Sequence, residues 1–418
     1  MPKFGKSNVD WQQRIDFDKL RKDRLAKAHK MLHKYGIGAA IIYNWDTGRY
    51  LGAPWNHPYS KHIANHFCFL VRDAGFPYVH VREGLDAWRV KDDAPWLKDR
   101  AVGEDVITQP AVIVWRDAAE DARLFKKTAQ QLKSVMKEHG VADLPVSLDY
   151  GPPPLIKALQ DEGLTVVNGN AWILEADMVK FEDEIELMKM AASCNEAGYG
   201  RLLKEFRFGM RENDAQAIMT RGIYEAGAEY IEGFVFNSGP RSSPRSYNWA
   251  DRTVRPGEFL SVETCHVTYC GYKVCYDRTF LAGGKPTALQ SEIYKIAADL
   301  QQMVKDTLKP GMTNHDMARL RPFPHSGLNM EEALKHHSTL GASQFSNHLG
   351  GIGIRWWDAP VCNLDQPEIP LEKNMTVAYH ATYTIEGYEG AAIENTYRIT
   401  DTGCECLCKM PWEELIIL

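Results

Sequence analysis

The sequence lacks any long apolar stretch. None of its hydrophobic runs approaches the roughly 18 residues that cross a bilayer. It also lacks an excess of positive charge: the formal net charge is -6 at pH 7, which offers no attraction to nucleic acid or to an anionic membrane. The first residues, MPKFGKSNVDWQQR, are polar and contain no apolar core of a signal peptide. We therefore expect a cytoplasmic protein with no nucleic-acid partner and no membrane partner.

A disulfide framework is also missing. The nine cysteines are an odd number without regular spacing, and no Cys-x-x-Cys pair occurs. This usage fits reduced thiols in the cytoplasm. Cys404, Cys406 and Cys408 alternate on a predicted C-terminal strand, where burial of one face explains them better than a metal site. No internal repeat or low-complexity segment is present.

The chain is long enough for two domains with substantial cores, because it has 418 residues, of which 44% are hydrophobic and 25% charged. Residues 1–176 alternate helical and strand signals, which predicts an α/β domain. The segment MVKFEDEIELMKMAA, which begins after Asp177, starts a helix with an acidic first turn. We therefore predict a second domain over residues 177–418 and an α/β (α+β) fold class.

Residues 257–280, GEFLSVETCHVTYCGYKVCYDRTF, predict a β-hairpin because β-branched and aromatic residues dominate both arms. Glu263 and Cys265 lie two apart on the first arm, so both leave the same face of the strand. Cys275 and Asp277 do the same on the second arm. Four groups able to bind a metal or move a proton thus share a small volume, where a structural hairpin more often carries Val, Ile or Thr. His266 is expected on the opposite face of a regular strand.

A family resemblance rests on this hairpin. Its frame is Pro256-Gly257-Glu258, a hydrophobic strand, Gly271-Tyr272 and Asp277-Arg278-Thr279-Phe280. It resembles the hairpin of the creatinase, prolidase and methionine aminopeptidase (peptidase M24-like) superfamily, most of all its dimethylsulfoniopropionate lyase branch. The resemblance implies a creatinase-like domain over 1–176, a catalytic domain of "pita-bread" fold over 177–418, and a homodimer. Under this resemblance, the aromatic loop from Trp45 to Tyr59 is either a packed surface loop or a contact with the substrate or with a partner subunit.

The metal-ligand positions of that superfamily are altered here. Gly350 stands where the segment Gly350–Ile354 would carry a metal-binding histidine, and His348 lies two residues earlier. His380 replaces the first family glutamate, and Glu394 retains the second. Compared with the lyase-like pattern, aspartates have become Glu263, Cys265 and Cys275. The segment PRSSPRSYNWADR lacks the substrate-facing histidine found there in many relatives.

Two kinds of site are compatible with these residues. The first is a metal site made of Glu263, Cys265, Cys275, His380 and Glu394, whose thiols and imidazole would favour zinc or iron. Against it, the cysteines are equally explained as small buried hydrophobes. The second is a metal-free site in which His380, between Glu263 and Glu394, donates or accepts a proton. Asp277 is a further catalytic candidate, although its neighbour Arg278 favours a structural ion pair.

The lyase resemblance implies a small zwitterionic substrate. Aromatic faces would suit its sulfonium or ammonium group, and packing in a core or interface is the alternative role for such residues. The substrate-binding candidates are Tyr247, Trp249, Trp356, Trp357 and Asp358. By the resemblance, Trp356 stands where the lyase has its proton-abstracting aspartate, and Asp358 lies two positions later.

The sequence thus predicts an enzyme, a lyase or hydrolase, that cleaves a carbon–nitrogen or carbon–sulfur bond of a small polar or zwitterionic molecule. A second reading is a catalytically silent relative that binds a ligand or a protein. A metal-dependent Xaa-Pro aminopeptidase ranks third, because its metal set and its upstream histidine are both broken.

Overall fold

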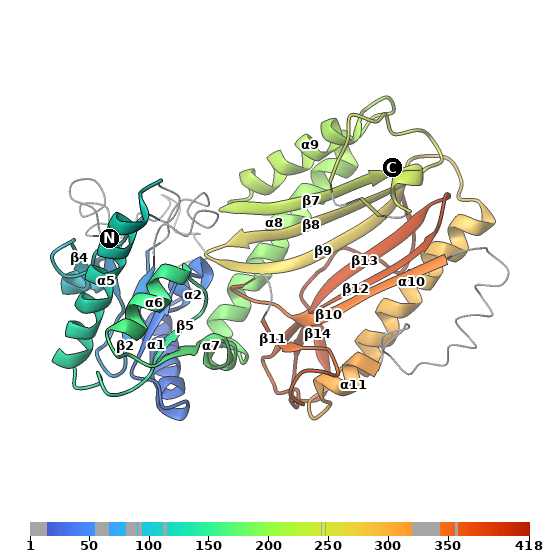
Figure 1. Ribbon diagram of the computed structural model, residues 1–418. Coiled ribbons are helices and arrows are strands. Elements are labelled where there is room, and N and C mark those ends of the chain that lie inside the picture. Colours follow the sequence, from blue (N-terminus) through green and yellow to red (C-terminus); the bar gives the residue numbers. More distant parts are fainter. Residues whose placement is uncertain are drawn as a thin grey trace. The chain divides into compact units, whose positions relative to one another are not determined.

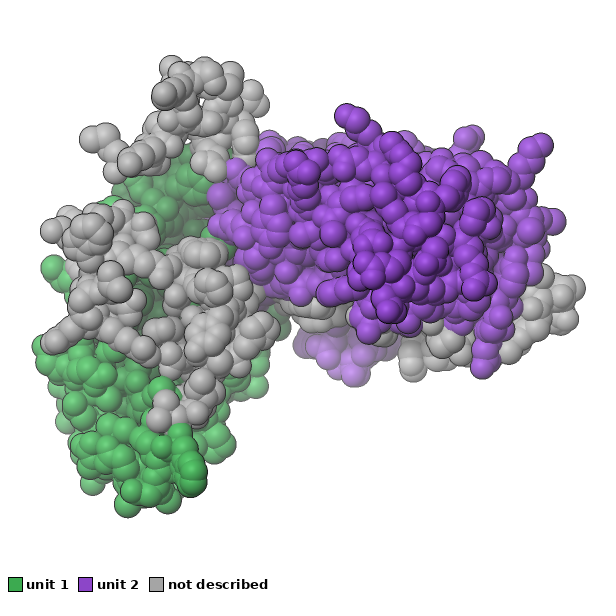
Figure 2. Space-filling model, turned by 90° about the horizontal axis from the view of Figure 1, so that it is seen from above, with its two compact units in different colours: residues 1–177 green, residues 178–418 purple. Residues whose placement is uncertain are grey.

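A computed structural model describes residues 15–54, 67–80, 90, 94–111, 115–243, 245–246, 248–319, 343–355 and 358–418. The chain divides into two compact units, unit 1 (Met1–Asp177) and unit 2 (Met178–Leu418), coloured separately in Figure 2. The division falls one residue after the boundary predicted from the acidic helix start. Among the described residues, no helix combines the length and the apolar character that crossing a bilayer requires.

Unit 1 is built on a six-stranded sheet with the order β4-β3-β2-β1-β5-β6. β1 (Ala39–Ile42) pairs antiparallel with β2 (Cys68–Val71) and parallel with β5 (Val146–Leu148). The other elements of this unit are α1 (Phe17–Lys34), α2 (Trp45–Tyr50), β3 (Tyr78–His80), η2 (Pro95–Arg100), β4 (Ala101–Val102), α5 (Ala118–Glu138), α6 (Pro153–Asp161), β6 (Val166–Asn168) and α7 (Asn170–Asp177).

The ends of the helices in unit 1 follow from local chemistry. The side chain of Asp117 caps α5 by accepting hydrogen bonds from the backbone nitrogens of Ala119 and Glu120, at 3.0 and 2.8 Å. α5 then buries Phe125 and Leu132 in the core of the unit. The first part of the predicted aromatic loop forms the short helix α2, and residues 55–66 of that loop lie outside the described part.

Unit 2 contains a nine-stranded sheet whose main path is β11-β10-β12-β13-β9-β8-β7, with β14 beside β13 and β15 beside β9. The predicted hairpin is β8 (Phe259–Tyr269) and β9 (Tyr272–Leu281). The other elements are α8 (Glu182–Glu205), α9 (Glu212–Glu225), β7 (Tyr230–Ser238), η3 (Gly239–Arg241), α10 (Ala288–Thr307), α11 (Asn314–Arg319), β10 (Ser343–Gly351), β11 (Asp358–Val361), β12 (Thr376–Ile385), β13 (Gly390–Ile399), β14 (Cys404–Cys406) and β15 (Ile416–Ile417).

Helices α8, α9 and α10 line one face of this sheet (Figure 1). From α8, Asn195 accepts a hydrogen bond from the hydroxyl of Thr264 on β8. From α10, the amide of Gln301 donates to the carbonyls of Tyr379 and Ile393, at 2.7 and 2.6 Å, and so joins β12 to β13. Because side chains alternate along a strand, the residues next to these contacts leave the sheet on the face opposite α8, α9 and α10.

The start of α10 offers a test of how that helix is held. The hydroxyl of Thr287 accepts from the backbone nitrogen of Gln290 at 3.1 Å, and the Gln290 side chain accepts from the nitrogen of Thr287 at 2.9 Å. We expect Thr287→Ala to lower the free energy of unfolding of unit 2 by about 1 kcal/mol, measured by urea denaturation. Ser291→Ala is the control, since the Ser291 hydroxyl donates to the backbone carbonyl of Thr287, four residues earlier, and satisfies no free backbone nitrogen at the helix start. Equal losses in both variants would contradict a capping role.

Candidate active site

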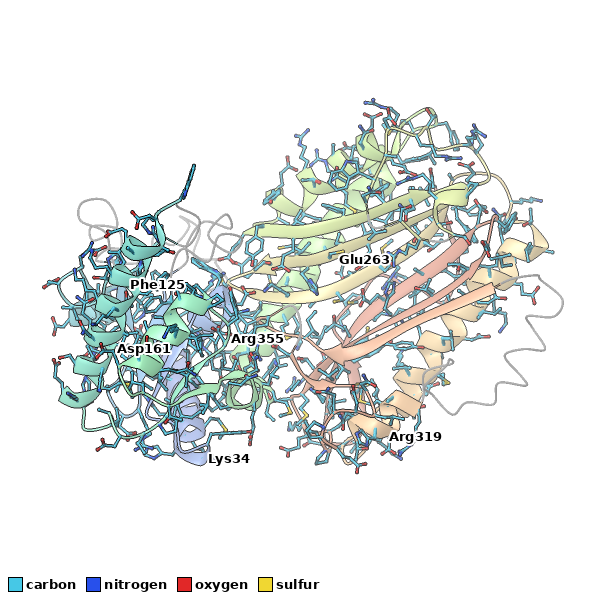
Figure 3. The ribbon with its side chains drawn as sticks, in the orientation of Figure 1. Lys34, Phe125, Asp161, Glu263, Arg319 and Arg355 are labelled. Atoms are coloured by element: carbon cyan, nitrogen blue, oxygen red, sulfur yellow. The ribbon has the colours of Figure 1, made fainter. Side chains whose placement is uncertain are left out.

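Four titratable side chains form a row across four neighbouring strands of unit 2. Glu263 on β8 lies opposite Asp277 on β9, Asp277 opposite Glu394 on β13, and Glu394 opposite His380 on β12. Directly opposed residues of neighbouring strands point to the same face of a sheet, here the face away from α8 and α10. Figure 3 labels Glu263 on this sheet. These four residues, called the acid–base row below, are the four predicted catalytic residues, so the fold brings all of them together.

A buried arginine completes the row. Nη2 of Arg245 lies 2.8 Å from Oε2 of Glu263 and 2.5 Å from Oδ2 of Asp277, and its Nη1 lies 2.6 Å from Nε2 of His380. The Arg245 side chain is only 8% exposed. Sequence reasoning did not single out Arg245, although it lies in the segment noted for its missing histidine. A physical argument could have predicted a cation at this point, because two buried carboxylates that face each other require a positive charge nearby.

The predicted ion pair between Asp277 and Arg278 is wrong. The Arg278 guanidinium donates instead to the backbone carbonyls of Asp277 and Glu394, at 2.6 and 2.9 Å, and to the side chain of Asn395 at 2.8 Å. Neighbours on a strand leave opposite faces, so Arg278 lies on the helix-covered face. The Asp277 carboxylate is therefore available to the acid–base row.

Burial and neighbouring charges determine which side chains of the acid–base row carry a proton. Burial raises the pKa of Glu394 to about 7, and the negative charges of Glu263 and Asp277 add to that rise against the opposing effect of His380 and Arg245. Among the described residues, Oε2 of Glu394 has no hydrogen-bond partner. Burial also acts to raise the pKa of Glu263, but the charges of Arg245 and His380 and the hydrogen bond from Cys265 together outweigh burial and lower that pKa. Glu394 is thus the carboxyl of the row poised to exchange a proton near neutrality.

His380 is the second proton-exchanging group. Burial and the Arg245 charge act to lower its pKa, but the charge of Glu394, the hydrogen bond with Asp277 and the charge of Glu263 together raise the pKa overall. Its Nε2 lies 2.6 Å from Nη1 of Arg245 and 3.1 Å from Oδ2 of Asp277. Nε2 accepts from Arg245 only when it carries no proton, and donates to Asp277 only when it does. The contact with Arg245 and the contact with Asp277 therefore suit different protonation states of His380.

The two hairpin cysteines lie beside the row. Sγ of Cys265 donates to Oε1 of Glu263 at 3.2 Å, and Sγ of Cys275 lies 3.1 Å from Nε2 of His266. Burial raises the pKa of both thiols, helped by Glu263 at Cys265 and by Glu394 at Cys275. Burial and these carboxylates thus favour the neutral thiol over the thiolate at both positions.

His266 lies differently from the expectation for a regular strand. The register between β8 and β9 shifts between Thr264 and Val267, and His266 has a φ of 58°. The extra residue is a β-bulge. It turns the imidazole of His266 toward Cys275, so the expectation that His266 lies away from the site fails because the strand is not regular.

The row also contains the donors that a metal ion would use. Glu263, Asp277 and His380 each offer a ligand atom within 4.8 Å of one another. The Arg245 guanidinium, however, lies among these same atoms, so a divalent ion there would meet occupied ligands and a neighbouring positive charge. In this arrangement the residues do not fit the metal that the resemblance implies. The zinc-or-iron hypothesis for Glu263, Cys265, Cys275, His380 and Glu394 stays a prediction.

The predicted substrate-binding residues are only partly described. Trp249 is 44% exposed, while Tyr247, Trp356 and Trp357 lie outside the described residues. Asp358 is fully buried, and its carboxylate lies 3.1 Å from Nζ of Lys180 and 2.9 Å from Nε of Arg355. This geometry gives Asp358 a structural ion-pair role, and its part in substrate binding stays a prediction.

Comparison with known proteins places this geometry in context. The model of metallopeptidase family M24 matches residues 186–401. An uncharacterized hydrolase/peptidase, y4tL, of Sinorhizobium fredii is 28% identical over 257 residues, which cover 59% of this chain and 60% of that protein. The dimethylsulfoniopropionate lyase DddP of Roseovarius nubinhibens is 22% identical over 313 residues, covering 72% and 66%. The matches thus span less than two thirds of the length of these relatives.

Solved structures extend the similarity over almost the whole chain. An Xaa-Pro dipeptidase from Bacillus anthracis superposes with a TM-score of 0.72 at 18% identity, covering 95% of this chain and 100% of that one. The dipeptidase PepE from Mycobacterium ulcerans gives a TM-score of 0.70 at 19% identity, covering 96% and 98%. At such identities the likeness shows the fold alone. It confirms the predicted creatinase-like and pita-bread architecture.

Proposed function

The chain belongs to metallopeptidase family M24, and from that premise we propose that it is a hydrolase or lyase that cleaves a carbon–nitrogen or carbon–sulfur bond of a small polar or zwitterionic substrate. The observation that carries this proposal is the acid–base row with the Arg245 guanidinium set into it. The names of relatives support the reaction class, since they include dimethylsulfoniopropionate lyases and an Xaa-Pro dipeptidase of Pyrococcus furiosus.

The row divides the work of catalysis among its members. Arg245 contacts the carboxylates of Glu263 and Asp277, so we assign the mobile proton to Glu394 or His380. One of these two groups accepts a proton, from water in a hydrolase or from the carbon next to the bond in a lyase. The other returns a proton to the leaving group. Two neighbouring titratable groups held in different environments are the usual basis for such paired roles.

None of these catalytic steps uses a metal ion. A divalent metal, zinc or iron, is the alternative, and it requires the Arg245 side chain to leave the row, because the guanidinium contacts the same carboxylates. A catalytically silent relative that binds a ligand is the reading that remains if no substrate is turned over.

A substrate screen tests the proposal. Dimethylsulfoniopropionate and Xaa-Pro dipeptides, named for relatives, form the first panel, followed by other small zwitterions. We expect turnover of at least one compound, and a fall in kcat of at least about 100-fold in His380→Gln. The matched control is Glu405→Gln on β14, whose carboxylate faces Lys189 and Arg398 outside the row. A His380→Gln variant that folds and keeps the full kcat would refute the acid–base assignment.

A further inference from the structure

A second chain of polar side chains runs beside the acid–base row. Sγ of Cys275 lies 3.1 Å from Nε2 of His266, and Nδ1 of the same imidazole lies 3.4 Å from Oε2 of Glu232 on β7. The order is thiol, imidazole and carboxylate, with the two ring nitrogens facing different partners. We call Cys275, His266 and Glu232 the thiol triad. A nucleophile, a base and a group that orients the base are the parts of nucleophilic catalysis, and such contacts are often loose before substrate binds.

The β-bulge builds this triad. In a regular strand His266 would face the helices, as Thr264 does, whose hydroxyl reaches Asn195 of α8. The left-handed φ of 58° instead brings His266 to the face of the acid–base row. Non-glycine residues adopt this conformation uncommonly and at a cost of about 1–3 kcal/mol. Sheet pairing on both sides of the bulge maintains the costly conformation.

The carboxylate of the triad is held in place by a buried lysine. Nζ of Lys273 on β9 lies 3.5 Å from Oε1 of Glu232 and donates to the carbonyl of Ile354 at 2.5 Å. Lys273 is fully buried, and Glu232 is 10% exposed. The ammonium of Lys273 thus places a positive charge beside the Glu232 carboxylate, whose Oε2 lies 3.4 Å from Nδ1 of His266. The other ring nitrogen of His266, Nε2, faces the thiol of Cys275.

The thiol also adjoins the proton-exchanging end of the row. Cys275 and Asp277 lie two apart on β9 and leave the same face, and the thiol of Cys275 interacts with the carboxyl of Glu394. A group bound at sulfur would therefore lie next to Glu394. The two sets of residues can act on one substrate.

We propose that Cys275 is a catalytic nucleophile that attacks an acyl or amidine carbon of a small amide-like substrate, with His266 as its base and Glu232 as the residue that positions His266. The inference rests on the proposed function and selects C–N hydrolysis within it. His266 Nε2 takes the thiol proton as sulfur bonds to the carbon. The C–N bond then breaks, and the amine leaves with the electron pair and the proton from His266. Water, deprotonated by Glu394 or His266, releases the acyl group and restores the thiol.

Alkylation of the thiols tests the triad without a known substrate. The folded full-length protein is treated with chloroacetamide at pH 7.5, and modification at each cysteine is followed by peptide mass spectrometry. We expect Cys275 to react faster than Cys265, its neighbour without a contact to an imidazole among the described residues. We expect His266→Asn to slow Cys275 at least about tenfold. Asn is chosen because it tolerates a left-handed φ.

Glu232 is tested as a positioning residue. Glu232→Gln should slow alkylation of Cys275, and Glu232→Asp should restore part of the rate, which a merely structural loss would not do. Thermal unfolding of each variant separates these effects from misfolding. Equal rates at Cys275 and Cys265, or a Cys275 rate unchanged in His266→Asn, overturn the triad.

The alkylation and turnover results together distinguish failure of the thiol triad from failure of the proposed function. Rapid alkylation of Cys275 without turnover of any compound supports the triad and counts against the hydrolase. Turnover of an amide that survives in Cys275→Ala overturns the triad and leaves the proposed function intact. Turnover with an acid-stable mass adduct on Cys275, absent in Cys275→Ala, supports both.

Discussion

The Arg245→Met variant is expected to lose about 3–5 kcal/mol of unfolding free energy at pH 7.5, the usual cost of removing one partner from a buried ion pair. Arg245 is 8% exposed and neutralises Asp277, which is fully buried, and Glu263, which is 14% exposed. Without the guanidinium, two carboxylates face each other with the imidazole of His380, 3.1 Å from Asp277, as the remaining neighbouring cation when it is protonated. Urea denaturation measures the loss. Arg221→Met on α9 is the matched control, because its side chain is 66% exposed and its ion pair with Glu225 should contribute less than about 1 kcal/mol.

The same variant is expected to gain a metal site. Removing the guanidinium frees the ligand atoms of Glu263, Asp277 and His380, which lie within 4.8 Å of one another. Added Zn²⁺ or Mn²⁺ should then raise the Tm of Arg245→Met, and EDTA should reverse the rise. The unsubstituted chain should show neither effect.

Metal analysis of protein purified without chelator decides between the two forms of the site. Near-stoichiometric zinc or iron in the unsubstituted chain, lost in a Cys265→Ser/Cys275→Ser double variant, would contradict the role given to Arg245 and support the metal hypothesis. Protein without bound metal would leave the acid–base row as the chemistry of the site.

Glu394→Gln is expected to change how stability depends on pH. The pKa of Glu394 rises from an ordinary 4.5 to about 7 on folding, so between these values the folded chain binds a proton that the unfolded chain does not. Stability from this group is therefore complete below pH 4.5 and is lost as pH rises to about 7. The rise corresponds to about 3 kcal/mol. The glutamine variant does not titrate at this position and lacks that loss.

Urea midpoints at intervals from pH 4 to pH 8 measure the effect as the difference between the two proteins. The difference is needed because other groups of the row also respond. The raised pKa of His380 contributes stability present below about pH 6.5 and lost at higher pH. The lowered pKa of Glu263 contributes stability present above pH 4.5 and lost at lower pH. Parallel curves for Glu394→Gln and the unsubstituted chain would show that Glu394 ionises normally.

Much of the site could be predicted because alternation along a strand is a local property. Glu263, Cys265, Cys275 and Asp277 were assigned to one face by spacing alone, and the hairpin places them there. The pairing of Glu394 with His380 across β12 and β13 is not local, and only the family resemblance pointed to it. The same resemblance correctly predicted that a creatinase-like domain precedes a pita-bread domain in the chain.

The features of the site that the sequence did not predict have physical causes. Arg245 approaches the row from the segment between η3 and β8, and no periodicity says where a side chain in an irregular segment will point. The bulge at His266 depends on a left-handed φ, which histidine adopts rarely enough that its presence in a strand gives no sequence signal. Asp277 and Arg278 are adjacent and opposite in charge, but adjacency in a strand separates side chains to opposite faces.

The bulge makes His266 a supernumerary residue relative to β9, although the pairing of β8 with β7 shows no shift there, with Gly233 opposite Cys265 and Ile231 opposite Val267. Val267 still pairs with Val274 and Thr268 with Lys273, which are the partners that β8 would have if residue 266 were absent and the pleat continuous. Removing residue 266 would therefore leave each side chain of the hairpin on its present face of the sheet. A strand that kept the histidine without a bulge would instead move every side chain beyond it to the opposite face. The same removal would shift the pairing of β8 with β7 by one residue, so the sheet as a whole requires a residue at this position.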